Sequence, residues 1–190
     1  SVGLMSIHTG VRLHLSRHAI SKEEYRKAFD ETLGTGNYVL YNHFGSLEGD
    51  NLLNKIRYLA ISEECDFIVL DHVSIAISGL EGDNERKLID YLMTQMRSIV
   101  EETGVGMIVI SHLRRPDNSQ KSHEEGGITS LAQLRGSHAI SQLSDIVLGL
   151  ERNQQESNEE LRNTTRVRVL KNRFTGETGI GGYLTYNRKT

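Results

Sequence analysis

The sequence predicts an α/β fold in which a twisted, mostly parallel sheet is flanked by helices, with an antiparallel hairpin at one edge. Two apolar runs, Phe67–Leu70 and 106–110, have the character of strands, and each is followed by polar residues. Helical patterns alternate with these runs. Continuous apolar strands separated by helices are typical of a parallel sheet that is covered on both faces. With 190 residues, no internal repeat and no linker, the chain is expected to form one domain over 1–190.

Four segments have helical patterns. In the first, Ser21 stands three residues before Glu24, which is a capping-box pattern, and Gly34 is placed to end the helix. The other three space apolar residues at helical intervals and cover 50–64, 84–104 and 128–144.

Strands are expected where short apolar or alternating runs stand between turn residues. The predicted strands cover 37–41, 67–71, 105–111, 145–151, 164–173 and 181–187. The last two are joined by a Gly-rich turn and are expected to form the edge hairpin. Two polar segments, 114–127 and 152–163, follow strands, so we expect them to be loops near the edge of the sheet where ligands bind.

Composition narrows the class of protein. A net charge of −3 argues against wholesale non-specific binding of nucleic acid but allows a local basic patch. No apolar run approaches the ~20 residues of a membrane span, and the N-terminal stretch has no signal-peptide pattern. The single cysteine, Cys65, allows no internal disulfide. We therefore expect an intracellular protein.

The residues at the strand ends suggest phosphate and metal chemistry. Four hydrophobic residues followed by Asp71 are typical of a strand that delivers a carboxylate to a phosphate edge, where it holds Mg²⁺ directly or through water. His112 follows the neighbouring strand, where it can contact a γ-phosphate. The loop behind it, 114–127, holds Arg114 and Lys121 and could bind a nucleic-acid backbone. A solvated loop with a capping histidine is the alternative.

A strand near the C-terminus ends with two cations. Lys171 and Arg173 are two residues apart and therefore share one face of the strand. Only Glu177 is close to them in the sequence, which favours an external partner such as a transferring phosphoryl group. A solvated Lys/Arg pair is the alternative. No G-x-x-x-x-G-K-[ST] motif occurs, so the element that should cradle the phosphates is missing.

These motifs, in this order and spacing, resemble the helicase domain of the DnaB-like family. The matching strings are FIVLDH, GVGMIVISHLRRP, HEEGG, LAQLRGSHAISQLSD, GLERNQQ and VRVLKNRFTGETGIGGYLTYN. Within the family, the chain is most similar to the primase-helicases of short-tailed bacteriophages and more distantly to Twinkle, from about Ile7 to Asn187. The resemblance implies a RecA-like (P-loop NTPase) fold, a hexameric ring, and nucleotide hydrolysis that drives translocation on single-stranded DNA and separation of the duplex.

The resemblance also implies roles for individual residues. Asp71 resembles the Walker B aspartate that positions Mg²⁺, and His112 resembles the sensor that couples the γ-phosphate to the DNA loop. The DNA-binding positions match Arg114, Lys121 and Arg135, and the pair that flanks the nucleotide base matches Arg152 and Tyr186. Arg173 resembles the arginine finger and Lys171 the lysine beside it, both serving the neighbouring subunit's site.

The cofactors implied are Mg²⁺ and ATP or a dNTP, and the partners are single-stranded DNA and further copies of the chain in a ring, with no membrane. The location implied is the cytoplasm of a bacterial or phage-infected cell. The family's Walker A loop and general-base glutamate precede the stretch that begins at Ser1. We therefore expect a partial RecA-like domain, its C-terminal part, that does not hydrolyse nucleotide by itself.

Two alternatives stay open. A RecA-type recombinase, or strand-exchange ATPase, would share the fold, although the pairing of a finger with an edge hairpin in KNRFTGETGIGG disfavours it. A non-catalytic RecA-like module that only binds DNA or a partner would explain the missing phosphate loop.

Overall fold

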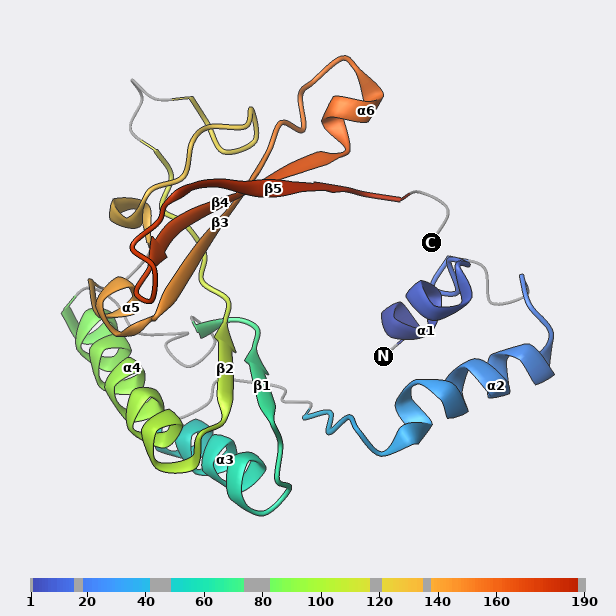
Figure 1. The fold of residues 1–190 in the computed structure, drawn as a ribbon, viewed down its shortest axis with the longest axis horizontal. Helices are drawn as coiled ribbons and strands as arrows, with labels where there is room; N and C mark the ends of the chain where they lie inside the picture. The colour runs from blue at the N-terminus through green and yellow to red at the C-terminus, as the bar shows by residue number, and fades with distance from the viewer. Residues whose placement is uncertain are drawn as a thin grey trace. The chain divides into compact units, whose positions relative to one another are not determined.

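The computed structural model describes residues 2–15, 19–41, 49–73, 83–116, 121–134 and 138–187. The chain divides into two compact units (Figure 1). The smaller unit comprises Ser1–Asn42 with Tyr186–Thr190, and the larger unit comprises His43–Thr185. The assignment of 1–190 to a single domain stays a prediction.

The smaller unit is helical. Its elements are α1 (Val2–Thr9), α2 (Lys22–Glu31) and the 3₁₀ turn η1 (Leu33–Thr35). Met5, Leu13 and Ala28 form its buried core. The predicted start of α2 is confirmed, because the Glu24 N–H donates to Ser21 Oγ at 3.2 Å and the Ser21 N–H donates to Glu24 Oε2 at 2.7 Å. These bonds satisfy two backbone donors at the end of the helix, as a capping box does.

Two predictions for this unit are wrong. The helix ends at Glu31 rather than Gly34, because the chain tightens into a 3₁₀ turn that contains Gly34. The segment 37–41 is not a strand, since it joins neither of the sheets in the described residues, and a strand needs a neighbour to receive its backbone hydrogen bonds. Instead, Tyr38 and Leu40 line an apolar cavity of about 410 Å³ within this unit.

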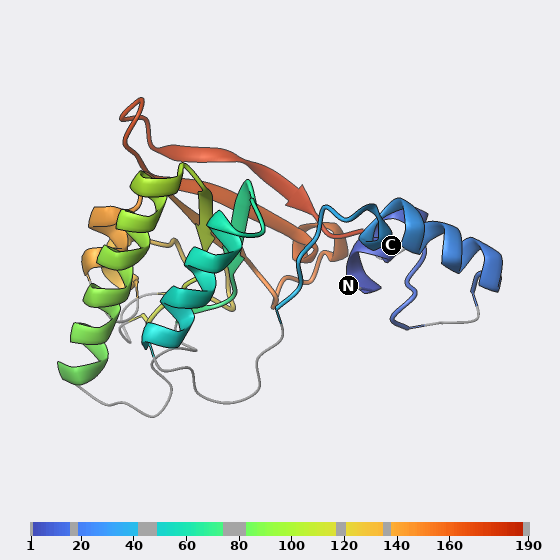
Figure 2. The ribbon, with the colours of Figure 1, turned by 90° about the horizontal axis from the view of Figure 1, so that it is seen from below.

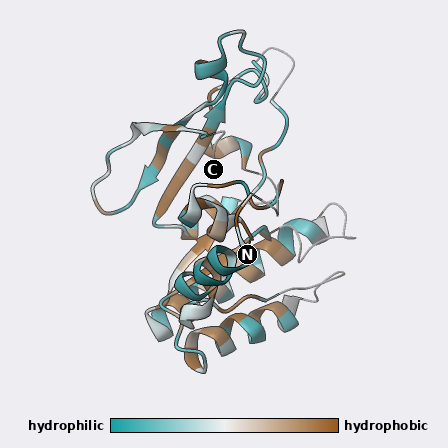
Figure 3. Cartoon of the chain, turned by 90° about the vertical axis from the view of Figure 1, so that its right-hand side faces the viewer, coloured by the Kyte–Doolittle hydropathy of each residue, from teal (hydrophilic) through white to brown (hydrophobic). Residues whose placement is uncertain are grey.

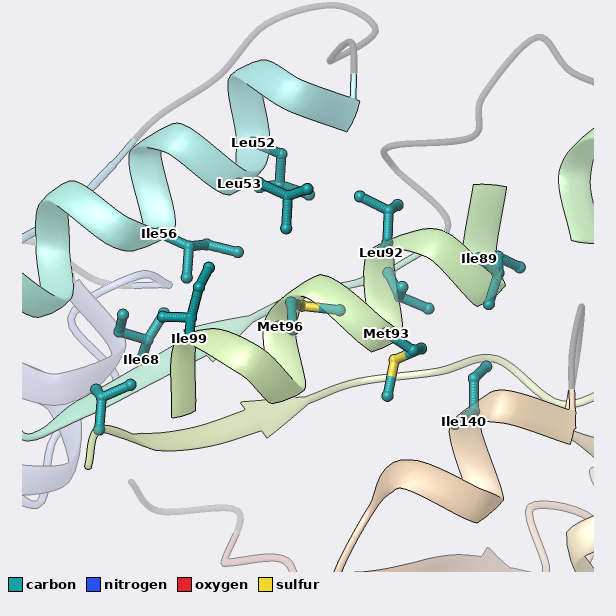
Figure 4. Packing of buried hydrophobic residues seen from close by; sticks show 12 residues of the cluster. Leu52, Leu53, Ile56, Ile68, Ile89, Leu92, Met93, Met96, Ile99 and Ile140 are labelled. Atoms are coloured by element: carbon teal, nitrogen blue, oxygen red, sulfur yellow. The ribbon is translucent and has the colours of Figure 1, made fainter. Parts of the chain in front are cut away.

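The first half of the larger unit alternates helices and parallel strands. Its elements are α3 (Gly49–Ile61), β1 (Phe67–Leu70), α4 (Asp83–Thr103) and β2 (Gly106–Val109). The strands pair in parallel with Leu70 opposite Val109. The two helices lie on the same side of this pair (Figures 1 and 2). The core of this half lies between α3, α4 and β1, and Ile140 of the later segment also contributes to it (Figure 4). Its buried residues are Leu52, Leu53, Ile56, Ile68, Val73, Ile89, Leu92, Met93, Met96, Ile99, Val105 and Ile140.

The second half of the larger unit is an antiparallel sheet with short helices. Its elements are η3 (Leu131–Gln133), α5 (His138–Leu143), β3 (Ile146–Arg152), α6 (Glu159–Arg162), β4 (Thr164–Asn172) and β5 (Gly179–Thr185). The strands follow the order β3-β4-β5, so the predicted edge hairpin is confirmed. The helix predicted over 128–144 is mostly wrong, because the described part holds only the turn η3 and the six-residue α5.

In the described residues, the helices cover one face of the strands. The side chain of Ile68 is buried at 7% exposure, whereas its neighbours Phe67 and Val69 are 71% and 61% exposed. On β3, Val147 is buried and Leu148 is 55% exposed. Colouring by hydropathy shows hydrophobic residues both on the inner faces of the helices and along the strands (Figure 3). The predicted covering of both faces is therefore not seen in this part of the chain.

The parallel pair and the antiparallel sheet are not joined by a ladder of hydrogen bonds in the described residues. A cavity of about 510 Å³ lies between β2 and β3, and Met93, Met96 and Val100 of α4 line it. Among the described residues, no helix combines the length and hydrophobicity needed to span a bilayer.

Candidate functional site

The ends of β1 and β2 bring the predicted metal and sensor residues to one edge of the parallel pair. Asp71 directly follows β1, and His112 lies three residues beyond β2. Two hydrogen bonds continue the pairing past the strands: the Ile110 N–H donates to the Leu70 carbonyl at 2.9 Å, and the Val73 N–H donates to the Ile110 carbonyl at 3.0 Å. The topology thus places Asp71 and His112 at the same carboxyl edge, where open α/β sheets bind ligands.

A second histidine connects these two residues. The ring of His72 lies edge-on against that of His112, with 4.3 Å between centroids and 64° between planes. Nδ1 of His72 is buried and has no hydrogen-bond partner among the described residues, whereas Asp71 and His112 are exposed. A buried polar atom without a partner is destabilising. His72 therefore has an unused polar atom behind the exposed edge.

The environment of Asp71 suits Mg²⁺. In nucleotide sites this ion is usually held by one or two protein carboxylates together with phosphate oxygens and water. Asp71 is exposed, and no group of three or more His, Cys, Asp or Glu side chains that could enclose a metal occurs among the described residues. A metal shared between Asp71 and nucleotide phosphates fits this arrangement, and a metal enclosed by protein does not.

The predicted DNA loop, 114–127, is closed at its base. The Arg114 N–H donates to the Gln133 carbonyl at 2.7 Å, and Nε2 of His123 lies 3.0 Å from the Arg114 carbonyl oxygen. The side chains of Arg114 and Lys121 are exposed. The backbone is therefore fixed where the loop leaves the sheet, while both cations face solvent.

The two cations differ in their surroundings. Glu125 accepts hydrogen bonds from the Ser122 hydroxyl at 2.7 Å and the Ser122 N–H at 3.2 Å, and these bonds, with the charge of Lys121, lower the pKa of Glu125. Lys121 therefore lies beside a carboxylate. Arg114 forms no ion pair within the described residues. Arg114 is thus better placed to bind an external phosphate.

The C-terminal part of the loop is hydrogen-bonded to the residues that follow β3. The Gln154 N–H donates to the Glu124 carbonyl at 2.8 Å, and Glu125 forms an isolated antiparallel bridge with Asn153. Asn153 and Gln154 immediately follow Arg152, which is predicted to contact the nucleotide base. The predicted DNA loop and the predicted base-contacting residue therefore share one anchoring point on β3.

A buried ionic cluster lies beside this anchoring point. The side chain of Glu151 is 1% exposed. Its carboxylate accepts hydrogen bonds from the N–H and hydroxyl of Thr129, at 2.8 and 2.9 Å, from Arg168 Nε at 2.7 Å, and from Arg166 Nε. Burial raises the pKa of Glu151, but the bonds from Arg168, Thr129 and Arg166 outweigh it and hold the pKa at about 2. A Cβ at Gly149 would collide with the Thr129 side chain, so close packing reinforces this cluster.

Arg152 is held within the larger unit by the C-terminal end of α6. Its Nε donates to the Arg162 carbonyl at 2.7 Å, and its Nη2 lies 3.3 Å from Asn163 Oδ1. Tyr186 belongs to the smaller unit, where the Arg12 guanidinium lies 5.6 Å from the centroid of its ring. The pairing of Arg152 and Tyr186 around a nucleotide base stays a prediction.

Lys171 contacts the end of α5. Its ammonium donates to the carbonyls of Ser141, Gln142 and Ser144 at 2.7, 3.1 and 2.8 Å. A cation at this position satisfies carbonyls that the helix leaves unpaired and complements the helix dipole. The predicted external partner is therefore not needed to explain Lys171, and its predicted catalytic role is untested.

Arg173 also has a partner within the chain. Its Nη1 lies 3.1 Å from Asp145 Oδ1, and the other oxygen of Asp145 accepts from Arg97 Nη1 at 2.6 Å. The argument that only Glu177 is close enough to pair with Arg173 is thus wrong, because antiparallel pairing brings Asp145 beside it. The side chain of Arg173 is still 56% exposed, so its guanidinium is accessible to an external group.

One predicted DNA contact, Arg135, lies outside the described residues, as do residues 117–120 of the loop. Sequence reasoning missed Asp145 and Glu151 because their partners are distant along the chain: Arg173 is 28 residues from Asp145. A signal for Glu151 did exist. Arg166 and Arg168 alternate with apolar residues on one strand, and two half-buried cations on one face require an acid on the neighbouring strand.

Comparison with known proteins identifies a family and relatives of this chain. The family model of the DnaB-like helicase C terminal domain matches residues 4–189. The DNA helicase/primase of Enterobacteria phage T3 is 44% identical over 191 residues, which cover 98% of this chain and 33% of that protein. The replicative DNA helicase DnaB of Treponema pallidum (strain Nichols) is 25% identical over 105 residues, covering 55% of this chain and 22% of that protein. The chain thus spans about a third or less of the length of these relatives.

Two solved structures share the fold. One, described as an ATPase domain, superposes with a TM-score of 0.67 at 16% identity, covering 97% of this chain and 69% of that chain. The other, a DnaB-like replicative helicase studied with its interactions with primase, superposes with a TM-score of 0.70 at 18% identity, covering 91% of this chain and 41% of that chain. These likenesses confirm the predicted α/β fold as RecA-like.

Proposed function

Because the chain belongs to the family of DnaB-like helicase C-terminal domains, we propose that it is part of the motor of a replicative DNA helicase. In the intact protein, hydrolysis of ATP or a dNTP drives translocation on single-stranded DNA and separation of the duplex. The helicase names of the relatives favour this function over that of a strand-exchange ATPase.

The observation that carries the proposal is the arrangement at one edge of the sheet. Asp71 directly follows β1, His112 lies three residues beyond the adjacent parallel strand β2, and the loop 114–127 begins two residues after His112. A residue that contacts the γ-phosphate at this point is directly connected to a loop that contacts DNA. Such a connection is what a motor needs in order to convert the state of the nucleotide into movement of the nucleic acid.

The residues at this edge have distinct proposed roles. Asp71 holds Mg²⁺, which neutralises charge on the β- and γ-phosphates when it is bound. His112, supported by His72, contacts the γ-phosphate. Arg114 and Lys121, with Arg135 nearby in the sequence, bind phosphates of single-stranded DNA.

Two further groups act on the nucleotide. Arg152 and Tyr186 flank the base. Arg173, with Lys171 beside it, serves the nucleotide of the adjacent subunit in a hexameric ring, where a guanidinium stabilises charge that develops on the transferring phosphoryl group. The exposure of Arg173 supports this role, since its guanidinium is accessible from outside the chain.

The test uses the intact protein that contains this chain. Asp71→Asn removes the metal's anchor, so it should abolish Mg²⁺-dependent hydrolysis stimulated by single-stranded DNA. Asp66→Asn is the matched control, because Asp66 is exposed at the opposite end of β1 and should tolerate the change. Near-normal turnover of Asp71→Asn would show that the metal site is elsewhere.

The chain by itself serves as a second test. It has no G-x-x-x-x-G-K-[ST] motif, so we expect it to hydrolyse no nucleotide alone. If the intact protein also proves inactive towards every nucleoside triphosphate while still binding DNA, the module is a binding domain and the motor assignment is wrong.

A further inference from the structure

We propose that Asp145 is a positioning residue that orients Arg173 toward the nucleotide of the adjacent subunit. The inference rests on the proposed function, because it assumes that Arg173 acts on that nucleotide. It assigns to Asp145 a role that the sequence motifs do not suggest.

Asp145 holds Arg173 through both backbone and side chain. The Arg173 N–H donates to the Asp145 carbonyl at 2.8 Å, which extends the β3–β4 ladder one pair beyond Ile146 and Asn172. The Asp145 carboxylate then accepts from Arg173 Nη1 at 3.1 Å. The first contact fixes where the side chain starts, and the second fixes the direction in which it leaves.

Asp145 is itself braced from two sides. Its second oxygen accepts from Arg97 Nη1 at 2.6 Å, and Arg97 also pairs with Glu101 one turn along α4. On the other side, the Lys171 ammonium holds the carbonyl of Ser144, which immediately precedes Asp145. A carboxylate fixed in this way can hold a partner more rigidly than a carboxylate on a mobile loop.

The exposed fraction of the side chain increases from Arg97 and Asp145 to Arg173, as expected if Arg173 faces an external ligand. Arg97 is 28% exposed, Asp145 30% and Arg173 56%. Arg173 is therefore the outermost member, and one hydrogen bond to Asp145 leaves most of its five N–H donors for phosphate oxygens. The inner pair does not need to move for Arg173 to reach an external anion.

Orientation of this kind should affect the transition state more than the binding of substrate. An arginine finger acts on charge that develops during phosphoryl transfer, and small misplacements of a catalytic group reduce the rate steeply. In the intact protein, Asp145→Asn should therefore lower kcat by about 10- to 100-fold and leave KM nearly unchanged. Asp145→Glu keeps the charge and should recover part of kcat. Glu177→Gln, at an exposed carboxylate in the same hairpin, is the control and should have no effect.

A double variant separates positioning from general support of the fold. If Asp145 acts only through Arg173, then Asp145→Asn combined with Arg173→Ala should be no slower than Arg173→Ala alone. If Asp145→Asn does not fold, Arg97→Lys tests the same cluster from α4, because it keeps the charge but loses the planar fork that bridges Asp145 and Glu101. Arg97→Lys should lower kcat by a smaller factor than Asp145→Asn does, and only when Arg173 is present.

The possible results are distinguishable. An additional loss in the double variant, or a normal kcat in Asp145→Asn, would overturn the positioning role while leaving that of Arg173 intact. A faster Asp145→Asn variant would also overturn it, because Asp145 would then be competing with phosphate for Arg173. If Arg173→Ala itself keeps normal kcat, the proposed role of Arg173 is wrong, and the positioning role falls with it.

Discussion

The carboxylates of Asp71, Asp145 and Glu151 lie in different environments, and this difference decides what each can do. Asp71 is exposed and can bind a cation from solution. Asp145 is shared between two arginines, and the hydrogen bond from Arg97, with that from Arg173, lowers its pKa despite partial burial. Glu151 is almost fully enclosed. Only Asp71 is therefore available to an incoming metal, and the other two serve as fixed anions within the protein.

Glu151 gives a prediction about stability and pH. Its pKa in the folded protein, about 2, lies below the ordinary value of 4.5, so the folded state favours the ionised form. Its contribution is therefore complete above about pH 4.5 and is lost as the pH falls towards 2. Glu151→Gln should lower the free energy of unfolding of the intact protein at pH 7 by about 3 kcal/mol, because Arg166 and Arg168 lose their anion.

Chemical denaturation at several pH values between 7 and 2 measures this effect. The difference between the parent protein and Glu151→Gln should shrink as the pH falls through this range. Glu177→Gln, at an exposed position, should track the parent throughout. A constant difference at all pH values would show that Glu151 contributes by packing rather than by charge.

At the scale of elements, strong local signals predicted the structure well. The capping box at Ser21 and the apolar spacing of α3 and α4 located three helices, and the five strands that the structure describes beyond residue 60 were predicted within a few residues. Each of these segments carries its own periodicity or cap. The positions of Asp71 and His112 at the strand ends followed from the same local patterns.

Elements that depend on distant partners were predicted poorly. The segment 37–41 has the composition of a strand, but whether it becomes one depends on a neighbour that its own sequence does not specify. The same applies to Arg173, whose partner Asp145 is brought near only by the pairing of β3 with β4. Interactions of this kind require the topology, which local patterns do not contain.

The loop 114–127 gives a prediction about DNA. Because Arg114 is exposed, has no ion pair within the described residues and lies two residues after His112, it should bind the phosphates of DNA of any sequence. Arg114→Ala in the intact protein should weaken binding to all single-stranded oligonucleotides alike. It should also reduce the slope of log K against log[salt] by about 0.7 for each phosphate that the variant no longer neutralises.

Fluorescence anisotropy at several salt concentrations measures this slope. Arg86→Ala is the matched control, because Arg86 is an exposed arginine on α4 and should leave the slope unchanged. A variant with normal slope but altered sequence preference would mean that Arg114 contacts bases instead of phosphates.

At the scale of the whole molecule, the proposed residues belong to two different nucleotide sites. Under the proposed function, Asp71 and His112 serve the nucleotide bound by their own subunit, whereas Arg173, which directly follows β4 and is 56% exposed, serves the nucleotide of a neighbour. A nucleotide site divided in this way would require each subunit to complete the site of the next. The central claim is therefore that hydrolysis depends on Asp71 from one copy and Arg173 from another.

A mixing experiment with intact subunits tests this claim most directly. Arg173→Ala alone should bind nucleotide almost normally but hydrolyse it about 10³-fold more slowly, and Asp71→Asn alone should be inactive. In mixed rings, an Arg173→Ala subunit still offers Asp71, and an Asp71→Asn neighbour still offers Arg173, so some interfaces regain both groups. We predict that hydrolysis stimulated by single-stranded DNA rises well above that of either variant alone. Mixed rings that stay as inactive as the separate variants would contradict the claim that Arg173 acts across the interface.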